Sequence, residues 1–176
     1  VVNRGHSHDR ETFRKAAWVL TMAGVYIVPG FWRTYYGGWG GRGTAFLPED
    51  PEALPAIADL QALHSFFTRI ESGARREWWK LMPHDQLVSS RSNDADRSPG
   101  HAYCLADRGY SQVVYVENAR SADLVVEGSP RATYRLTRFD PRTARWVLVN
   151  PAVAGGTVVT PETPDTEDWV FEATRN

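Results

Sequence analysis

The 176-residue sequence contains one cysteine, only two lysines and no long run of hydrophobic residues. The single cysteine, Cys104, excludes an internal disulfide and a cysteine-based zinc cluster, and its place in an alternating apolar stretch predicts a small buried side chain. No apolar run reaches the roughly 18 residues that a membrane-spanning helix requires, so we expect no membrane partner. The net charge of -1 gives no basic excess for phosphate contacts, so we expect no nucleic-acid partner.

Motifs for cofactor binding and for nucleophilic catalysis are also missing from the sequence. The chain has no P-loop, no G-x-G-x-x-G between a strand and a helix, and no G-x-S-x-G motif. We therefore expect no cofactor. What is present is ordinary globular composition, with 42% hydrophobic and 23% charged residues, which suits one domain or two small ones.

The most informative stretch is a glycine-rich loop that carries four aromatic side chains. Residues 31–43 read FWRTYYGGWGGRG, in which five glycines are interleaved with Trp32, Tyr35, Tyr36 and Trp39. Glycine lets the backbone lie close to a ligand, and the rings offer flat apolar faces. This composition predicts a binding loop. The alternative is an ordinary connection whose rings fold back onto the core.

The first half of the chain has helical periodicity. A helix is predicted over 9–23, ending at Gly24, with an apolar stripe made of Phe13, Ala16, Ala17 and Leu20. A second helix is predicted over 52–72, with an apolar stripe made of Ile57, Leu60, Leu63, Phe67 and Ile70. Between the helices, residues 25–28 indicate a short buried strand. This order is typical of a parallel α/β unit, although one strand lacks the neighbours that such a sheet needs.

The second half changes to a period of two after the polar segment 89–100. Alternating apolar residues and turn signals predict seven strands, over 101–106, 112–117, 123–127, 132–139, 146–150, 156–160 and 169–174. Their close spacing is typical of an antiparallel sandwich. We therefore predict an α+β fold with three parts: an α/β segment over 1–88, a linker over 89–100 and an antiparallel β-sandwich over 101–176.

Four tryptophans outside the aromatic loop are assigned to packing. Trp78 and Trp79 precede the linker, so we expect them in the core or at the seam between the two halves. Trp146 and Trp169 alternate with apolar neighbours and are expected in the sandwich core.

The sequence His6-x-His8-Asp9 follows an apolar stub at the start of the chain. Two histidines two residues apart in an extended segment can present their rings to one metal ion, but further ligands at matching spacing are missing. A loop in which Ser7 or Asp9 caps the following helix explains the same residues. We favour the capping loop and expect no metal.

Several motifs in a fixed order resemble the C-terminal part of apiosidase-like glycoside hydrolases. They are RKAAW at 14–18, the apolar strand and aromatic loop that follow, WWKLMP at 78–83 and FDPRT at 139–143. In that family a (β/α)8 barrel is followed by a small β-sandwich that carries the label of a collagen-binding domain. The resemblance covers nearly the whole chain and implies that residues 1–88 are a partial barrel segment, arranged as helix, strand, loop and helix.

The resemblance also implies a site, because such barrels carry their chemistry on the loops that follow the strands. The aromatic loop would line a sugar-binding cleft, and the histidine-rich segment would supply hydrogen bonds to sugar hydroxyls. The substrate-binding residues implied in this way are Trp32, Tyr35, Tyr36, Trp39, His6, His8 and Asp9.

Catalytic residues cannot be assigned from the resemblance. Glycoside hydrolysis requires two carboxylates, and the partner that the family takes from an earlier strand has no counterpart in this sequence. At the position of the seventh strand, where an acidic residue is expected, the sequence reads Val2-Asn3-Arg4-Gly5. We therefore expect this chain alone to be inactive as an enzyme.

Two functions remain open at this point. The first is the C-terminal section of a glycoside hydrolase, which contributes an aromatic sugar-binding loop and an accessory β-sandwich. The alternative is a non-catalytic carbohydrate- or protein-binding module. The expected partner is a carbohydrate. Because the strand over 25–28 lacks neighbours, we also expect either a homo-oligomer or a missing N-terminal barrel segment.

Overall fold

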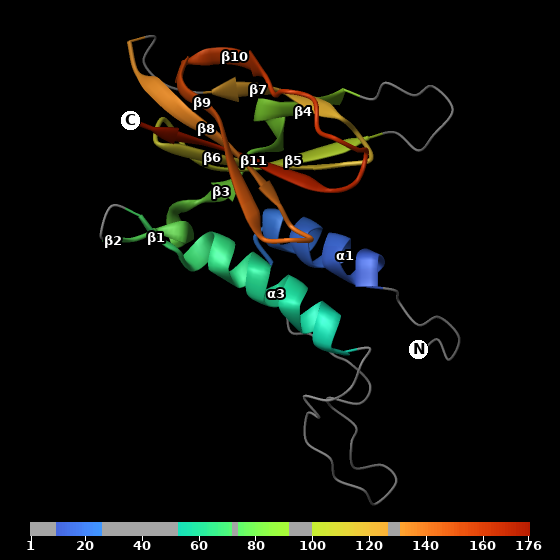
Figure 1. Ribbon diagram of the computed structural model, residues 1–176. Coiled ribbons are helices and arrows are strands. Elements are labelled where there is room, and N and C mark those ends of the chain that lie inside the picture. The colour runs from blue at the N-terminus through green and yellow to red at the C-terminus, as the bar shows by residue number, and fades with distance from the viewer. Residues whose placement is uncertain (1–9, 26–52, 72–73, 92–99, 127–130) are drawn as a thin grey trace, which may run out of the picture.

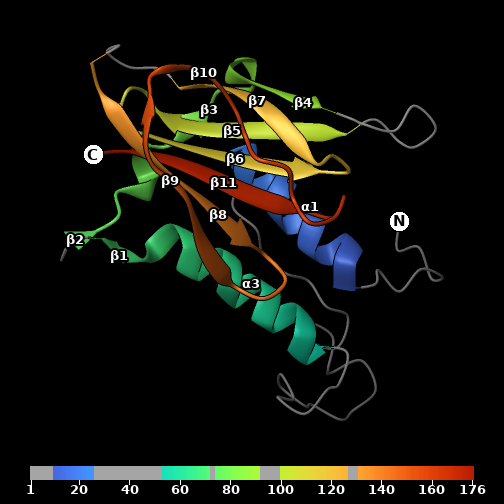
Figure 2. The same ribbon diagram turned by 45° about the horizontal axis from the view of Figure 1, so that its top comes forward.

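The computed structural model describes residues 10–25, 53–71, 74–91, 100–126 and 131–176. These residues form three layers: two helices, a six-stranded sheet and a three-stranded sheet (Figures 1 and 2). Within this part of the chain every strand pairing is antiparallel. The predicted α+β class is therefore confirmed, and the helices cover one face of the larger sheet.

The helices are α1 (Arg10–Met22) and α3 (Ala53–Thr68), and neither of these described helices is long and apolar enough to cross a membrane. Helix α1 ends at Met22, and Gly24, the predicted stop residue, terminates it with a φ of 75°, which residues with a Cβ rarely tolerate. The amide of Val25 bonds the carbonyl of Leu20 at 2.9 Å, and the amide of Gly24 bonds that of Thr21 at 2.9 Å. This pair of bonds is a Schellman motif, which brings Leu20 and Val25 side by side at the helix end.

The two sheets contain all seven strands predicted for the second half. In spatial order, the six-stranded sheet consists of β3 (Met82–Pro83), β5 (His101–Asp107), β6 (Ser111–Glu117), β11 (Trp169–Arg175), β8 (Thr133–Asp140) and β9 (Arg145–Ala154). The three-stranded sheet consists of β10 (Gly156–Val159), β7 (Ser121–Val126) and β4 (Val88–Arg91). A small hairpin of β1 (Ile70–Glu71) and β2 (Ala74–Arg75) follows α3.

The short elements between the halves join the sheets. Two single turns of 3-10 helix, η1 (Trp78–Lys80) and η2 (Asp85–Leu87), flank β3. Strand β3 pairs with β5, and β4, which overlaps the start of the predicted linker, pairs with β7. The division into 1–88 and 101–176 stays a prediction, while in the structure α1 and α3 share one core with strands of the later half.

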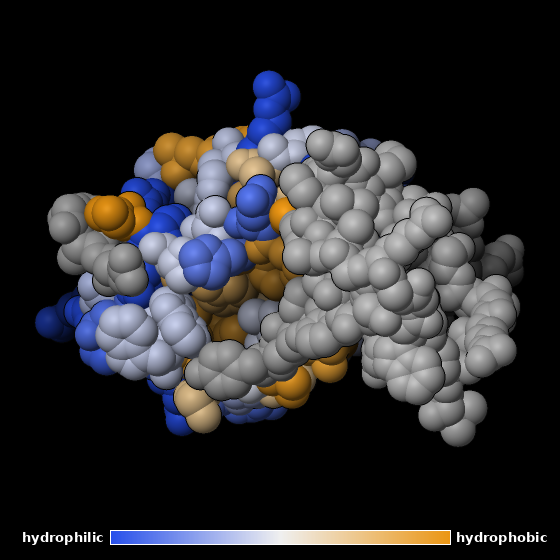
Figure 3. All heavy atoms as spheres, turned by 90° about the horizontal axis from the view of Figure 1, so that it is seen from below, coloured by the Kyte–Doolittle hydropathy of each residue, from blue (hydrophilic) through white to orange (hydrophobic). Residues whose placement is uncertain are grey.

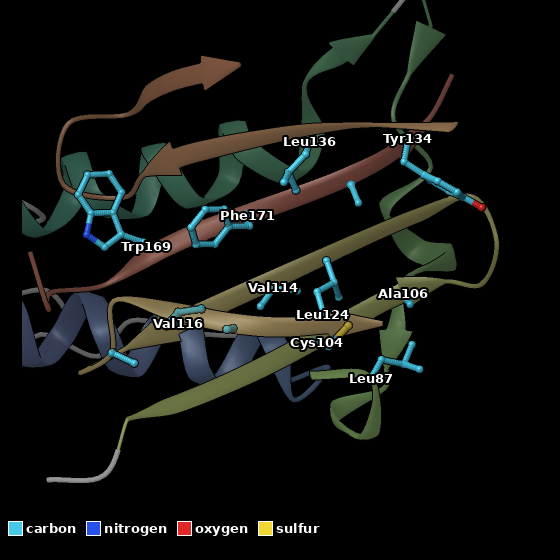
Figure 4. Packing of buried hydrophobic residues seen from close by; sticks show 13 residues of the cluster. Leu87, Cys104, Ala106, Val114, Val116, Leu124, Tyr134, Leu136, Trp169 and Phe171 are labelled. Atoms are coloured by element: carbon cyan, nitrogen blue, oxygen red, sulfur yellow. The ribbon is translucent and has the colours of Figure 1, made fainter. Parts of the chain in front are cut away.

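Two hydrophobic cores lie on opposite faces of the six-stranded sheet. The first lies between the two sheets and includes Cys104, Val114, Leu124 and Phe171 (Figure 4). Cys104 is fully buried there, as its place in the sequence pattern predicts. The second core lies between the sheet and the helices, where Trp18 stacks on Tyr115 with ring centroids 5.6 Å apart and planes 1° apart. Successive residues along the central strands therefore point alternately into the first and the second core.

Helix α1 buries a different face from the one that its apolar pattern predicts. Of the predicted stripe only Ala17 is in the core, whereas Ala16 is exposed and Leu20 is 43% exposed. The buried face consists of Arg14, Ala17, Trp18 and Met22. Helix α1 thus carries apolar side chains on two faces. In α3 the predicted stripe holds at Leu63 and Phe67, which pack into the second core.

A buried ion pair fixes α1 on the sheet. Arg14 donates hydrogen bonds to both carboxylate oxygens of Asp168, the shortest from Nε to Oδ2 at 2.9 Å and from Nη2 to Oδ1 at 2.6 Å. The Asp168 side chain is fully buried and precedes β11 directly. Burial raises the pKa of the neighbouring Tyr115 phenol well above its ordinary range, and the negative charge of Asp168 raises it further. The positive charge of Arg14 compensates the buried negative charge of Asp168, which would be strongly unfavourable in this core without a partner.

A second charged cluster organises the turn after β8. Arg142 donates from Nε to Asp140 at 2.9 Å and from Nη1 to Asp165 at 2.9 Å, and its guanidinium lies 4.7 Å from the centre of the Trp169 ring. Burial alone would raise the pKa of both aspartates, but hydrogen bonds from Arg142 outweigh it, so the pKa of each is lowered. The ionised carboxylates therefore stabilise the turn.

We expect Arg14→Leu to lower the free energy of unfolding by about 3–5 kcal/mol, because it leaves the Asp168 carboxylate buried without a counter-charge. Adding Asp168→Leu should restore much of the loss, since the double variant removes both charges. Urea unfolding measures both effects, and Arg145→Leu, at an exposed position in β9, is the control. Equal effects of Arg14→Leu and Arg145→Leu would contradict the assignment.

The Arg142 cluster predicts a pH dependence of stability. Because the folded state lowers the pKa of Asp140 and Asp165 below the ordinary 3.8, their contribution is present above that pH and is lost as the pH falls through the folded values. Urea unfolding from neutral to acidic pH should show the loss, and Arg142→Met should flatten this acid limb. An unchanged limb in Arg142→Met would show that other carboxylates cause it.

Candidate functional site

The residues that the resemblance assigns to sugar binding lie outside the described residues. They are His6, His8 and Asp9 in the first segment, and Trp32, Tyr35, Tyr36 and Trp39 in the segment 26–52. The structure does place the two ends of the second segment. The described residues stop at Val25, after the Schellman motif of α1, and resume at Ala53, the first residue of α3.

A cavity of about 650 Å³ lies where the chain leaves α1. This volume is within the range of small-molecule sites in proteins. Figure 3 looks onto the helical side of the molecule and shows a hollow whose floor has the colour of hydrophobic residues. The end of α1 and the second half of α3 form two walls, which include Val25, Leu60, Leu63, His64 and Phe67.

The third wall comes from the segment that joins the helices to the sheets. Trp78, Trp79, Leu81, Met82 and Pro83 line the cavity there. The rings of Trp78 and Trp79 meet edge to face, with centroids 6.1 Å apart and planes at 80°. Trp78 packs partly into the second core, whereas Trp79 is 55% exposed. The predicted seam position is thus correct for Trp78, and Trp79 projects into solvent beside the cavity.

The hydroxyl groups of the cavity wall are already engaged. Thr21 donates from Oγ1 to the carbonyl of Ala17 at 2.9 Å, and Thr68 donates from Oγ1 to the carbonyl of His64 at 2.8 Å. Each hydroxyl hydrogen therefore points back into its own helix. A sugar requires several free donors and acceptors in addition to an apolar face, and this wall is mostly hydrocarbon and indole. The cavity suits an apolar occupant better than a sugar.

A buried glutamate holds the end of α3 that forms one wall. Glu172 of β11 forms ion pairs with Arg69, directly after α3, and with Arg76, whose Nη2 lies 2.5 Å from Oε1 of Glu172. The Arg69 guanidinium also lies 4.4 Å from the centre of the Trp146 ring. Trp146 therefore packs on Arg69 and is 40% exposed, so its prediction as sandwich core is wrong. Trp169 lies in the core between the sheets, as predicted.

No metal centre is found in the part of the chain that the structure describes, because no three histidine, cysteine or acidic side chains come together there. The carboxylates with clear structural partners, such as Asp168 and Glu172, are neutralised by arginines. Their arrangement supports packing of the helices on the sheet and offers no pair of free carboxylates for acid–base catalysis.

The fold is similar to that of known glycoside hydrolases. One structure described as a glycoside hydrolase matches 94% of this chain with a TM-score of 0.63 at 12% identity, and the match covers 37% of that protein. A glycoside hydrolase family 5 structure from Bacteroides vulgatus ATCC 8482 matches 94% of this chain with a TM-score of 0.61 at 12% identity, covering 36% of that protein. This chain therefore spans well under half the length of either structure.

Comparison by sequence gives no such match. No protein-family model matches the chain, and no curated protein matches it significantly. At 12% identity the two structures show that the fold is shared and nothing finer. The resemblance to glycoside hydrolases is thus confirmed at the level of fold, while the apiosidase-like specificity stays a prediction.

We expect Glu172→Gln to lower the free energy of unfolding by about 3–5 kcal/mol, because Arg69 and Arg76 then lose their buried counter-charge. Glu162→Gln is the matched control, since it makes the same chemical change at an exposed position. Thermal and urea unfolding of the two variants measure the difference. A Glu172→Gln protein as stable as the control would show that the ion pairs contribute nothing to holding α3.

Proposed function

We propose that this chain is a section of a carbohydrate-active protein of the glycoside hydrolase type, in which residues 31–43 bind sugar and the β-sandwich is an accessory unit. The observation that carries the proposal is the shared fold, which extends over 94% of the chain in two glycoside hydrolase structures. The match is to part of each structure, which agrees with a section rather than with a complete enzyme of that type.

The composition of the loop supports a sugar as its ligand. Sugar rings have apolar faces that stack on indole and phenol rings, and four such rings lie among five glycines in this loop. The cavity beside Trp79 is less suited to a sugar than the loop, because its wall is mostly apolar and its hydroxyl groups already donate to helix carbonyls. Sugar binding is therefore proposed for the loop and not for this cavity.

Catalysis is not part of the proposed role of this chain alone. Asp168 and Glu172 are buried in ion pairs with arginines, whereas a glycosidase needs two carboxylates that face its substrate. We expect the purified chain to release no product from aryl glycosides. Clear turnover that is lost in Asp9→Asn or Glu11→Gln would overturn this part of the proposal.

Sugar binding by the loop is tested by fluorescence titration. Oligosaccharide fragments of pectin and hemicellulose should quench the tryptophan emission of the chain saturably, because a stacked sugar changes the environment of the loop indoles. Trp32→Ala and Trp39→Ala should each weaken the affinity by roughly tenfold, which corresponds to the loss of about 1.4 kcal/mol of contact.

The matched control for this titration is Trp79→Ala. Trp79 is an exposed tryptophan outside the loop, so its removal changes the emission but should leave the affinity unchanged. Tryptophan emission that does not change on addition of any of the fragments would contradict the proposal. An affinity that is lost in Trp79→Ala and kept in Trp32→Ala would move the site from the loop to the cavity.

A further inference from the structure

We propose that the outer edge of β9, from Arg145 to Val149, binds an extended peptide as an additional strand of the six-stranded sheet. The peptide that fits this edge alternates acidic and apolar residues, because one side of β9 is basic and the other is apolar. The proposal does not depend on sugar binding, since β9 lies outside the loop 31–43.

Strand β9 is an open edge of the larger sheet. Within the described part of the chain it pairs with β8 alone, and its 10 residues make it longer than the strands at the other sheet edges, β3, β4 and β10 (Figure 2). Every second residue of an edge strand turns its N–H and C=O groups away from the sheet, where another strand can bond them. An extended polypeptide offers donors and acceptors at the matching spacing, so the edge itself specifies the class of partner.

The central part of this edge lacks the usual protection against strand pairing. Native edge strands commonly carry lysine, proline or an inward-pointing charge. The tryptophan, valine and leucine at 146–148 are 40%, 47% and 57% exposed, with no charge or proline among them. Pro151 has no N–H, and the amide of Ala152 already bonds Oδ1 of Asn150 at 2.9 Å. The accessible edge therefore ends before these residues.

One side of β9 is apolar and faces the helical layer. Trp146 and Leu148 lie opposite Phe139 and Thr137 of β8, and the Trp146 ring stacks on that of Phe66 in α3 with centroids 5.0 Å apart. Residues two apart in a strand point to the same face, so Leu148 lies on this side as well. Apolar side chains of an added strand would remove this surface from water.

The other side of β9 is basic. Val147 lies opposite Arg138, and Arg145 lies two residues earlier on the same side. Among the described residues neither arginine forms an ion pair: Arg138 bonds a backbone carbonyl at 3.4 Å, and Asp140, which lies opposite Arg145, is bonded by Arg142 instead. An acidic side chain of the added strand would supply the counter-charge that these two guanidiniums lack.

A second copy of the chain is a poorer partner for this edge. Strand β9 reads RWVLVNPAVA and contains no acidic residue. Two β9 strands paired about a two-fold axis would therefore gather arginines on one side of the joined sheet without a carboxylate. A separate acidic segment removes this deficit, so charge complementarity favours a peptide.

The experiment is a fluorescence-anisotropy titration of the full 176-residue chain against labelled synthetic peptides of about nine residues. A peptide in which glutamate and valine alternate should bind saturably. The same peptide with lysine in place of glutamate should bind at least about tenfold more weakly, because it places like charges opposite Arg145. Equal affinity of the two peptides, or no binding of the glutamate peptide, would overturn the proposal.

Charge reversal in the protein tests the position of the site. Arg145→Glu should weaken binding of the glutamate peptide at least about tenfold and strengthen binding of the lysine peptide. The matched control is Arg120→Glu, which makes the same change at an exposed position before β7 and should leave both affinities unchanged. Both positions are exposed, so both variants should unfold at the temperature of the wild type. Equal effects of the two variants would overturn the assignment to β9.

Backbone methylation tests whether the peptide adds as a strand. Alternate amides of an added strand face β9, so of two glutamate–valine peptides, one N-methylated at every glutamate and one at every valine, a single one should lose binding. Two methylated peptides that behave alike would overturn strand addition.

Hydrogen exchange and sedimentation complete the test. The bound glutamate peptide should slow hydrogen exchange of amides within 145–149, and unchanged exchange there would contradict the proposal. Sedimentation of the chain without peptide identifies the competing occupant. Self-association through β9 that excludes the peptide would show that a second copy covers this edge and would also overturn the proposal.

Discussion

The six-stranded sheet has to be covered on both faces, and the rest of the structure follows from this requirement. Strands β6 and β11 carry buried side chains at nearly every position, so neither face can be left in water. The three-stranded sheet covers one face, and α1 with α3 covers the other. Removing the helical layer would expose Val113, Tyr115 and Val170 at a cost of about 1.5–3 kcal/mol each. The helices are therefore an integral part of the sandwich and not an appendage to it.

Charges buried at the helical face decide where the helices sit. Asp168, just before β11, binds Arg14 of α1, and Glu172 within β11 binds Arg69 and Arg76 after α3. Apolar contacts are not directional and would allow a helix to slide, whereas a two-point guanidinium–carboxylate pair fixes position and rotation. One strand thus orients both helices, and the cavity between the helix ends is a consequence of that orientation.

The sequence predicted the strands of the sandwich well, because a two-residue period with turn residues between the runs is a local signal. Strands β3 and β4 were missed because two to four residues are too short to show a period. The rotation of α1 was predicted wrongly for a different reason: Arg14 counts as polar in any pattern, and its buried partner Asp168 lies 154 residues away. The exposure of Trp79 had no sequence signal, since a large aromatic residue beside a linker between two halves is usually buried. The predicted sugar-binding residues lie outside the described part of the chain, so they stay predictions.

The central place of β11 has a consequence for how the protein is made. This strand pairs with β6 on one side and β8 on the other, and it is the last strand of the described chain to be synthesised. On the ribosome, β5 can pair with β6 and β8 with β9 as local hairpins, but the two halves of the sheet cannot join until β11 has emerged. Until then the edges of β6 and β8 that face β11 are unpaired and the helices lack the ion pairs to Asp168 and Glu172, so wrong strand pairing is easiest in this interval.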